Sequence, residues 1–262
     1  MIVTRLMGGL GNIMFQMSAG YTLAKENGAK FYWRGVPEST HPSALGVDFR
    51  RLILAPGMAY ECENISVPLR FYNEPDLNPV PDAILSNIKA GQAYLFTGYF
   101  QNYRYCSRDS IQALFDFSVN PLPDPEPSYF LQVRRGDYLT AGDGLYNLNL
   151  PDGYFPRALK IAGERYPGAL TLVVSDDIPW CQDWEPLKDR RVQFIEENAE
   201  FSMRVMHHAS LGGIISNSSF GWWGLYSNME RPLHILPDRW FSRGNYYIDG
   251  YYYPGSEIFT TK

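Results

Sequence analysis

The chain has 262 residues, of which 45% are hydrophobic, and it carries a net charge of −5 at pH 7 with an isoelectric point near 5.4. This length suits one large domain or two smaller domains, each with a substantial core. The acidic balance argues against a general nucleic-acid surface, because such a surface gathers Lys and Arg to neutralise many phosphates. A strongly positive site is therefore expected to be local.

Cysteine content and hydropathy indicate the cellular location. The three cysteines, Cys62, Cys106 and Cys181, are far apart, and their spacing fits neither a disulfide framework nor a zinc site. The sequence has no run of about 18 apolar residues that could span a bilayer. A strand-like segment begins at Ile2, which leaves no room for a signal peptide. We therefore predict a cytoplasmic protein, for which peripheral contact with the inner face of a membrane stays open.

The first part of the chain has the pattern of an α/β unit. A short strand from Ile2 is followed by the glycine-rich stretch MGGLGN, a helix over 12–27 that Gly28 ends, and a second strand, KFYW. Residues 36–93 are punctuated by Pro and Gly and indicate no regular element. A strand within AYLFTGYFQNY and a helix over about 107–117 follow.

A proline-rich stretch separates two halves. Four prolines fall in NPLPDPEPS, residues 120–128, and predict a stiff linker, so we place domains at 1–122 and 123–262. The second domain alternates strands and helices. Its predicted strands are YFLQVR, LTLVVS, VQFIE, GGIISN and LHILP, and its predicted helices cover 154–166, a short stretch near Pro179, 200–210 and 219–229. This alternation predicts a doubly wound parallel sheet, which binds ligands outside the carboxyl ends of its strands.

Two adjacent arginines end the first strand of the second domain, in YFLQVRRGDYLT. Arginine stays charged and offers a planar fork of donors to phosphate or carboxylate oxygens, so we predict an anionic ligand. Side chains alternate along a strand, which places Gln132 and Arg134 on one face and Arg135 on the other. We predict that Arg134 binds the ligand and that Arg135 forms a supporting ion pair with Asp137. The alternative is that both arginines pair with surface carboxylates.

Two more polar clusters end strands of the same predicted sheet. SNSSFGWWG, residues 216–224, offers hydroxyl and N–H groups at a helix N-terminus, which favours an anion. Ordinary N-capping by Ser218 or Ser219 is the alternative. In VVSDD, Asp176 and Asp177 could hold a base or a ribose, or cap the next helix.

The glycine-rich stretch allows the backbone to approach a phosphate or a sugar closely. It matches a dinucleotide-binding fingerprint only in part, because Met14 stands where the third glycine belongs and Arg34 follows the second strand. An NADP-dependent oxidoreductase is therefore an alternative function. The sequence also lacks the Asp-x-Asp triplet with which metal-dependent sugar transferases hold a divalent ion. We expect arginine and helix dipoles to meet any phosphate charge.

Six motifs, in family order, resemble the α-1,2-fucosyltransferases, glycosyltransferase family 11. They are GGLGNIMFQMSAGYTLA, TGYFQNYRYC, VRRGDY, VVSDDIPWC, ISNSSFGWWG and RPLHILPDRWF. The resemblance implies a GT-B fold with two Rossmann-like domains facing across a cleft, the N-terminal one on the acceptor side and the C-terminal one binding the nucleotide sugar. It also implies GDP-fucose as donor, inversion at the anomeric carbon, no metal or other cofactor, and the 2-hydroxyl of a galactose-terminated acceptor. A noncatalytic relative that binds sugar nucleotides is the second alternative.

The resemblance further implies roles for individual residues. Arg134 would bind the β-phosphate. The resemblance does not identify a base for the acceptor hydroxyl, and we take Asp137 as the candidate. The candidate donor-binding residues are Gly9, Gly11, Asn12, Gln132, Arg135, Asp176, Asp177, Asn217, Ser218, Ser219 and Phe220. Within this set the serines and Phe220 would hold the phosphate at the helix N-terminus, and one of the two aspartates would contact guanine. The glycine-rich stretch would face the donor from the other domain.

Two positions depart from the family pattern. Gln132 stands where the family commonly has His near the base, so a protonatable contact is missing there. Ile13 replaces a usual glutamine, and contacts on the acceptor side are expected to differ. Acceptor specificity is expected to reside in residues 36–93.

Overall fold

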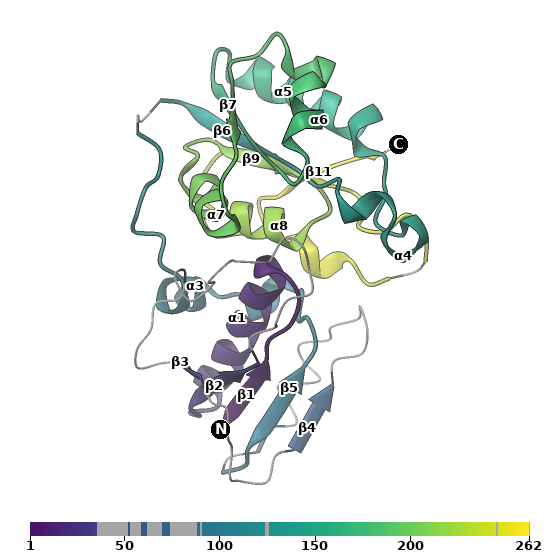
Figure 1. Cartoon of the computed structure of the whole chain (residues 1–262). Helices are drawn as coiled ribbons and strands as arrows, with labels where there is room; N and C mark the ends of the chain where they lie inside the picture. The colour runs from purple at the N-terminus through teal and green to yellow at the C-terminus, as the bar shows by residue number, and fades with distance from the viewer. Residues whose placement is uncertain are drawn as a thin grey trace. The chain divides into compact units, whose positions relative to one another are not determined.

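The computed structural model describes residues 1–35, 52, 59–61, 70–73, 88–89, 91–123, 126–244 and 246–261 (Figure 1). The chain forms two compact units. The N-terminal unit consists of Met1–Asp116 with Tyr246–Tyr251, and the C-terminal unit of Phe117–Asn245 with Tyr252–Lys262. The predicted domain boundary, between residues 122 and 123, lies six residues after the boundary between the two units, which falls between Asp116 and Phe117. The stretch of residues 36–93 to which we assigned acceptor specificity lies mostly outside the described residues.

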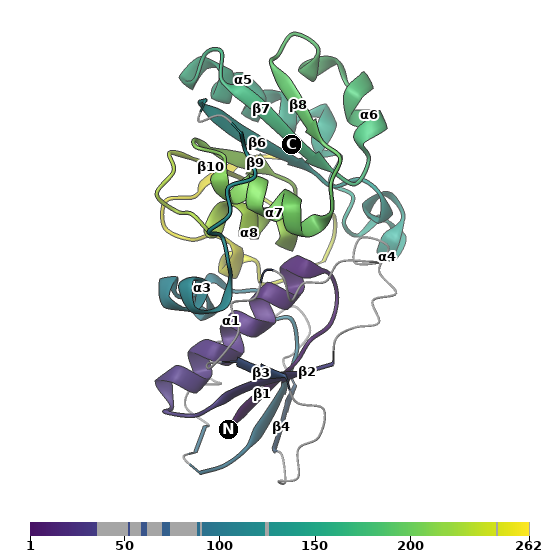
Figure 2. The same ribbon diagram turned by 60° about the vertical axis from the view of Figure 1, so that its left-hand side comes forward.

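A five-stranded parallel sheet forms the N-terminal unit, in the order β3-β2-β1-β5-β4. Its strands are β1 Ile2–Arg5, β2 Phe31–Arg34, β3 Ala59–Glu61, β4 Arg70–Asn73 and β5 Tyr94–Thr97. The helix α1, Leu10–Glu26, packs on this sheet, and α3, Arg108–Leu114, lies beside α1 (Figure 2). The sequence pattern did not indicate β3 and β4, because these short strands lie in the stretch of residues 36–93, where Pro and Gly interrupt the pattern.

The chain reverses its direction across the N-terminal sheet beside β1. From β1 it proceeds outward to β2 and β3, whereas β5 lies on the other side of β1. The switch point therefore lies between β1 and β5, where ligands of open parallel sheets bind outside the carboxyl ends. The glycine-rich stretch follows β1, and the motif GYFQNY follows β5.

The C-terminal unit contains a six-stranded parallel sheet in the order β11-β10-β9-β6-β7-β8. Its strands are β6 Ser128–Val133, β7 Leu170–Ser175, β8 Val192–Ile195, β9 Gly212–Ile215, β10 Leu233–Pro237 and β11 Glu257–Phe259. The doubly wound parallel sheet is confirmed. The sequence missed β11, whose three residues alternate too briefly to be recognised.

Helices cover both faces of the C-terminal sheet (Figures 1 and 2). On one face lie α5 Tyr154–Arg165 and α6 Ile178–Asp183, and on the other lie α7 Ala199–His208 and α8 Ser219–Tyr226. Leu131 and Val133 of β6 share a buried core with Phe155 and Leu159 of α5. Among the described residues, no helix is long and apolar enough to cross a membrane.

Candidate functional site

Three polar loops meet at the carboxyl edge of the C-terminal sheet. From β6 the chain proceeds to β7 and β8 on one side, and it later returns to β9 on the other side of β6. The switch point is therefore between β6 and β9. The loops after β6, β7 and β9 carry RRGD, DD and SNSSF, the three clusters that the sequence placed on one edge.

Arg134 ties these three loops together. Its Nη2 lies 2.7 Å from Asp137 Oδ1, and its Nη1 lies 3.0 Å from Asp176 Oδ2, in the loop after β7. Its backbone N–H donates to Ser216 Oγ, after β9, over 2.8 Å. The side chain is 14% exposed, so these contacts hold the guanidinium at a fixed, partly shielded position.

The predicted pair between Arg135 and Asp137 is wrong. Arg135 Nε instead pairs with Asp177 Oδ2 at 3.2 Å, and its guanidinium stacks 3.8 Å above the ring of Trp180. The prediction extended strand alternation past Val133, where β6 ends. Beyond that residue a turn leads into a 3-10 helix, Asp137–Leu139, which brings Asp137 to Arg134.

Gly136 allows Asp176, in the loop after β7, to approach the backbone of the loop after β6. A Cβ at this position would overlap with Asp176 Oδ2. The same carboxylate accepts from the backbone N–H of Arg135 through Oδ1 over 2.8 Å. Asp176 thus braces both arginines, and the glycine of RRGD makes this bracing possible.

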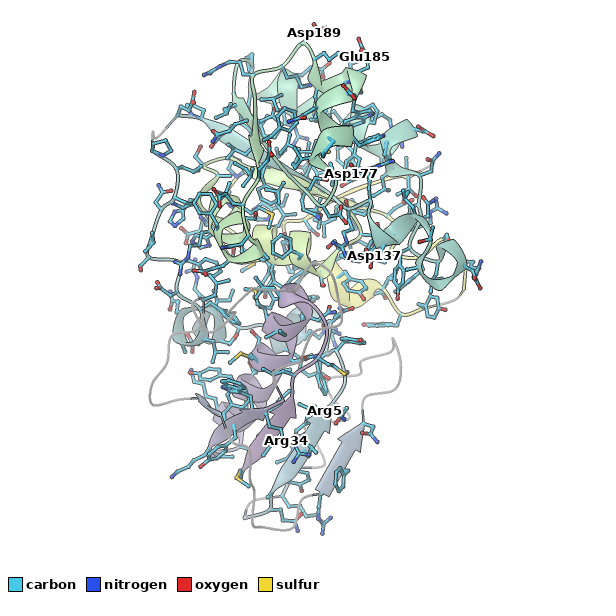
Figure 3. All side chains as sticks on the ribbon, viewed as in Figure 1. Arg5, Arg34, Asp137, Asp177, Glu185 and Asp189 are labelled. Carbon is cyan, nitrogen blue, oxygen red and sulfur yellow. The ribbon has the colours of Figure 1, made fainter. Side chains whose placement is uncertain are left out.

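The two aspartates of the β7 loop have different surroundings. Asp177 is the N-cap of α6, since its Oδ1 accepts from Trp180 N over 3.2 Å. Capping, one of the two interpretations of this motif, therefore applies to Asp177. Figure 3 labels this side chain. Contact of either carboxylate with guanine stays a prediction.

The N-terminus of α8 faces the same edge. Ser218 is the N-cap residue, but its side chain makes no capping hydrogen bond. The first intrahelical bond runs from Trp222 N to Ser218 O over 2.9 Å, so the N–H groups of residues 219–221 precede it. Such N–H groups together with the helix dipole favour an anion.

Neutral groups support the loop that enters α8. Tyr138 donates to Asn217 O over 3.2 Å, and burial raises the pKa of Tyr138 to about 12, so this phenol keeps its proton at neutral pH. The side chain of Asn217 donates to Tyr146 O and Trp240 O, at 3.1 and 2.8 Å. These contacts position the backbone of Asn217, and the direct contact of its side chain with a donor stays a prediction.

The side chain of Gln132, in β6, is buried. It is 3% exposed, and its Oε1 accepts from Ser216 N over 3.2 Å. It therefore joins β6 to the loop after β9. Its contact with guanine stays a prediction.

The cluster holds two guanidinium groups, Arg134 and Arg135, among the three carboxylates of Asp137, Asp176 and Asp177. Arg134 has five N–H donors, and Nε has no hydrogen-bond partner in the part of the chain that the structure describes. An anion at this edge could therefore accept from Arg134 and from α8 together. Among those same residues no three His, Cys, Asp or Glu side chains are grouped to hold a metal ion.

The glycine-rich stretch of the N-terminal unit is held by amide side chains. Gly9 is the N-cap of α1, and Gly11 lies buried in its first turn. Gln16, fully buried, accepts from Met7 N over 2.9 Å and donates to Met7 O over 3.1 Å. Asn12 Oδ1 accepts from Gln101 Nε2 over 2.6 Å. This last bond joins the first turn of α1 to the loop after β5, on the two sides of the switch point.

Sequence reasoning missed two residues here. Tyr251 donates to Gln101 Oε1 over 2.7 Å, which orients the Gln101 amide toward Asn12. Gln101 belongs to the motif TGYFQNYRYC, so its position was marked but its role was not. Tyr251 has no sequence signal, because residues 246–251 return to the N-terminal unit from far along the chain.

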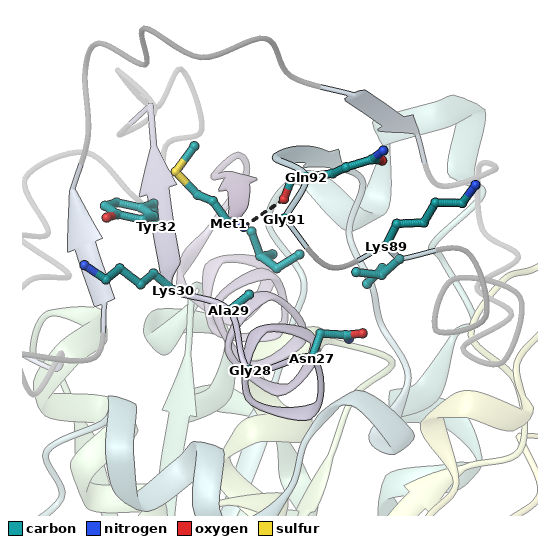
Figure 4. Close-up of a pocket in the computed structure, with 11 residues that line it drawn as sticks. Met1, Asn27, Gly28, Ala29, Lys30, Tyr32, Lys89, Gly91 and Gln92 are labelled. Atoms are coloured by element: carbon teal, nitrogen blue, oxygen red, sulfur yellow. Dashed lines mark hydrogen bonds between the residues drawn. The ribbon is translucent and has the colours of Figure 1, made fainter.

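A separate cavity of about 380 Å³ lies at the amino edge of the N-terminal sheet, away from the glycine-rich stretch. Met1, Asn27, Lys30, Tyr32 and Gln92 are among its lining residues. Figure 4 shows the side chains of Lys30 and Lys89 extending apart. No charged groups converge in this view, so we do not assign the candidate site to this cavity.

A family model decides the assignment. Glycosyl transferase family 11 matches residues 1–245. The chain belongs to glycosyltransferase family 11. The α-1,2-colitosyltransferase of Escherichia coli is 27% identical over 92% of this chain and 93% of its own length. The galactoside 2-alpha-L-fucosyltransferase Sec1 of Mus musculus is 27% identical over 70% of this chain, which spans about half (51%) of that relative.

Solved structures confirm the fold of this family 11 glycosyltransferase. The fucosyltransferase NodZ from Bradyrhizobium superimposes with a TM-score of 0.55 at 11% identity, covering 85% of this chain and 92% of NodZ. NodZ α-1,6-fucosyltransferase co-crystallised with GDP gives a TM-score of 0.55 at 12% identity, with 85% and 91% covered. The two parallel sheets flanked by helices thus form an α/β fold of the GT-B type.

Proposed function

We propose that this family 11 glycosyltransferase transfers L-fucose from GDP-fucose to the 2-hydroxyl of a β-galactoside, with inversion and without a metal ion. The observation that carries the proposal is the convergence of three loops on Arg134, beside the N-terminus of α8. Two murine relatives are named as galactoside α-1,2-fucosyltransferases. NodZ crystals were prepared with GDP and with GDP-fucose.

The chemistry requires stabilisation of a departing diphosphate. The bond between the fucose anomeric carbon and the β-phosphate oxygen breaks, and the acceptor 2-oxygen forms its bond on the opposite face. Negative charge grows on the β-phosphate, so donors aimed at it stabilise the transition state more than the ground state. Arg134 and the first-turn N–H groups of α8 supply these donors in the proposal. Asp137, beside Arg134, is the candidate base that takes the hydroxyl proton.

One relative favours a second donor. The Escherichia coli protein that covers 92% of this chain is named for colitosyl transfer. Colitose is fucose without its 3-hydroxyl, so the leaving group and the charge that Arg134 meets are the same for GDP-colitose. The donor test therefore includes both nucleotide sugars.

The test is a transfer assay with the purified chain. GDP-fucose, GDP-colitose and UDP-galactose are each incubated with a β-galactosyl disaccharide, and GDP release and the product's linkage are measured by chromatography and NMR. We expect fucosyl transfer to the 2-hydroxyl, with equal rates with and without EDTA. Loss of activity in EDTA and recovery with Mn²⁺ would contradict metal independence. Binding of GDP-fucose without GDP release supports the noncatalytic alternative, and binding of NADPH but not GDP supports the oxidoreductase.

Substitution of Tyr251 tests the hydrogen bonds that connect Tyr251 through Gln101 to Asn12 of the glycine-rich stretch. Tyr251→Phe removes the donor that orients Gln101, and Gln101→Ala removes the donor to Asn12. We expect each to lower kcat/KM by about 2- to 10-fold, since one hydrogen bond contributes about 0.5–1.5 kcal/mol. Initial rates at varied donor and acceptor concentrations measure the loss.

Tyr252→Phe is the matched control, because Tyr252 donates to Pro237 O in the C-terminal unit instead. Its kcat/KM should stay within twofold of the wild type. Equal losses in Tyr251→Phe and Tyr252→Phe would contradict a specific role for the contact with Gln101. If the double variant Gln101→Ala/Tyr251→Phe has the same kcat/KM as Gln101→Ala, Tyr251 acts through Gln101 on Asn12.

A further inference from the structure

Two arginines stand side by side at the carboxyl edge of the N-terminal sheet. Arg5 ends β1, Arg34 ends β2, and the parallel register of the two strands pairs Arg5 with Arg34. Figure 3 labels both side chains on this sheet. Paired residues of neighbouring strands project from the same face, so the two side chains leave the sheet next to each other.

The face that carries these arginines is the one away from α1. Gly20 of α1 lies so close to the sheet that a Cβ there would overlap with Thr4 and Phe31. Thr4 therefore faces α1. Because side chains alternate along a strand, Arg5 projects from the opposite face, together with its partner Arg34.

Neither guanidinium is neutralised within the described residues: no ion pair or side-chain hydrogen bond joins Arg5 or Arg34 to them. Arg134, Arg135, Arg165 and Arg191, by contrast, each pair with a carboxylate. Like charges that are directly opposite each other on neighbouring strands repel. An oxyanion between them would relieve this repulsion and accept from two planar forks at once.

The same edge also offers groups that suit a sugar. Asn73 of β4 pairs with Thr97 of β5. Thr4 of β1 pairs with Phe96 of β5, so Thr97, the next residue of β5, lies beside Arg5, the next residue of β1. A row of amide, hydroxyl and two guanidinium groups therefore crosses four strands. Phe71, two residues before Asn73 and on the same face, is 72% exposed. Gly8 follows Arg5 by three residues, so at most about 10 Å of chain separates this row from the glycine-rich stretch.

We propose that Arg5 and Arg34 bind a carboxylate or phosphate group carried by the acceptor, and that the enzyme prefers acidic galactosides. This inference rests on the proposed function, which assigns the acceptor to the N-terminal unit. The arginine pair binds the anionic group, and the neighbouring polar row binds sugar hydroxyls. Neutral galactosides lack the contact with the arginine pair.

Three acceptors with GDP-fucose test the proposal: β-galactosyl-glucose, β-galactosyl-glucuronic acid and β-galactosyl-glucose 1-phosphate. For the wild type we expect kcat/KM for at least one acidic acceptor to exceed the neutral one by about 10-fold or more, with the excess falling as salt rises. The uronic acid and the phosphate distinguish the two sources of the anion. Arg5→Gln with Arg34→Gln should abolish the preference.

Arg70→Gln is the matched control. Arg70 begins β4, at the amino edge of the same sheet. Arg70→Gln therefore removes the same charge from the opposite edge, and the preference for acidic acceptors should persist. Equal use of neutral and acidic acceptors by the wild type overturns the proposal, as does a preference that the double variant retains. Transfer to the neutral galactoside tests the proposed function separately. If no sugar is transferred to any acceptor, saturation-transfer NMR with each acidic disaccharide still tests the arginine pair. The proposal then requires that the wild type binds at least one acidic disaccharide and that the double variant does not.

Discussion

Arg134→Ala is expected to lower kcat for transfer by about 10²–10³-fold, because removal of one preorganised donor to a developing oxyanion typically has an effect of this size. Arg134 is the cation that the loops after β6, β7 and β9 hold together. GDP release at saturating donor and acceptor measures the effect. Circular dichroism and the thermal midpoint show whether the variant is folded.

Charge and geometry can be separated at this position. Arg134→Lys keeps a positive charge but loses the planar fork that reaches Asp137 and Asp176 together, so it should recover only part of the rate. Arg191→Ala is the control, since Arg191 forms an exposed pair with Glu126 and should keep wild-type kcat. Near-normal turnover of a folded Arg134→Ala protein would refute the role of Arg134 in stabilising the diphosphate.

Removing Arg134 also leaves the carboxylates of Asp137 and Asp176 near each other without their shared cation. Their repulsion could unfold the loops and lower kcat for a structural reason. Arg134→Ala combined with Asp176→Asn removes one of the two charges. If kcat stays low in this folded double variant, the loss belongs to the missing guanidinium and not to repulsion.

The sequence pattern is clearest where the strands are longest and most apolar. β6 and β7 have six residues each and are almost wholly buried, so their apolar runs are easily recognised. Polar motifs directly after such strands must lie on one edge, because all strands of a parallel sheet end on the same side. The meeting of Arg134, Asp176 and Ser216 follows from this rule.

The contacts within the site depend on turns, which have no period. Which aspartate pairs with which arginine is decided by the turn at Gly136 and by the 3-10 helix that follows it. Tyr251 reaches Gln101 from 150 residues away, through a segment that rejoins the N-terminal unit. Local pattern carries no information on such long-range contacts, and so both lay beyond prediction.

Arg231→Met is expected to lower the free energy of unfolding by about 3–5 kcal/mol, because several buried carbonyl groups lose a donor at about 1–3 kcal/mol each and relaxation recovers only part. Arg231 is 7% exposed. Its guanidinium donates to carbonyl oxygens near the C-terminal ends of two helices. From α7 and the residue after it these are Met206, His207 and Ala209, and from α8 and the residues after it Gly224, Leu225 and Asn228.

The charge of Arg231 suits this position. Burial lowers its pKa to about 10, so the guanidinium is still protonated at neutral pH. The C-terminal end of a helix carries partial negative charge, and one buried cation here meets two such ends. The opposite end of α8 is the candidate anion site, so Arg231 fixes the helix on which that site is built.

Urea denaturation of Arg231→Met and Arg231→Lys distinguishes hydrogen bonding from packing. Methionine retains an unbranched apolar chain, whereas lysine retains the charge with three donors instead of five. If the carbonyl contacts stabilise the unit, stability falls in the order Arg, Lys, Met; if Arg231 mainly fills space, Met equals or exceeds Lys. Arg165→Met is the control, because its exposed pair with Glu257 should contribute at most about 1 kcal/mol. A loss at Arg231→Met no larger than in this control would mean that the two helix ends do not depend on the buried guanidinium.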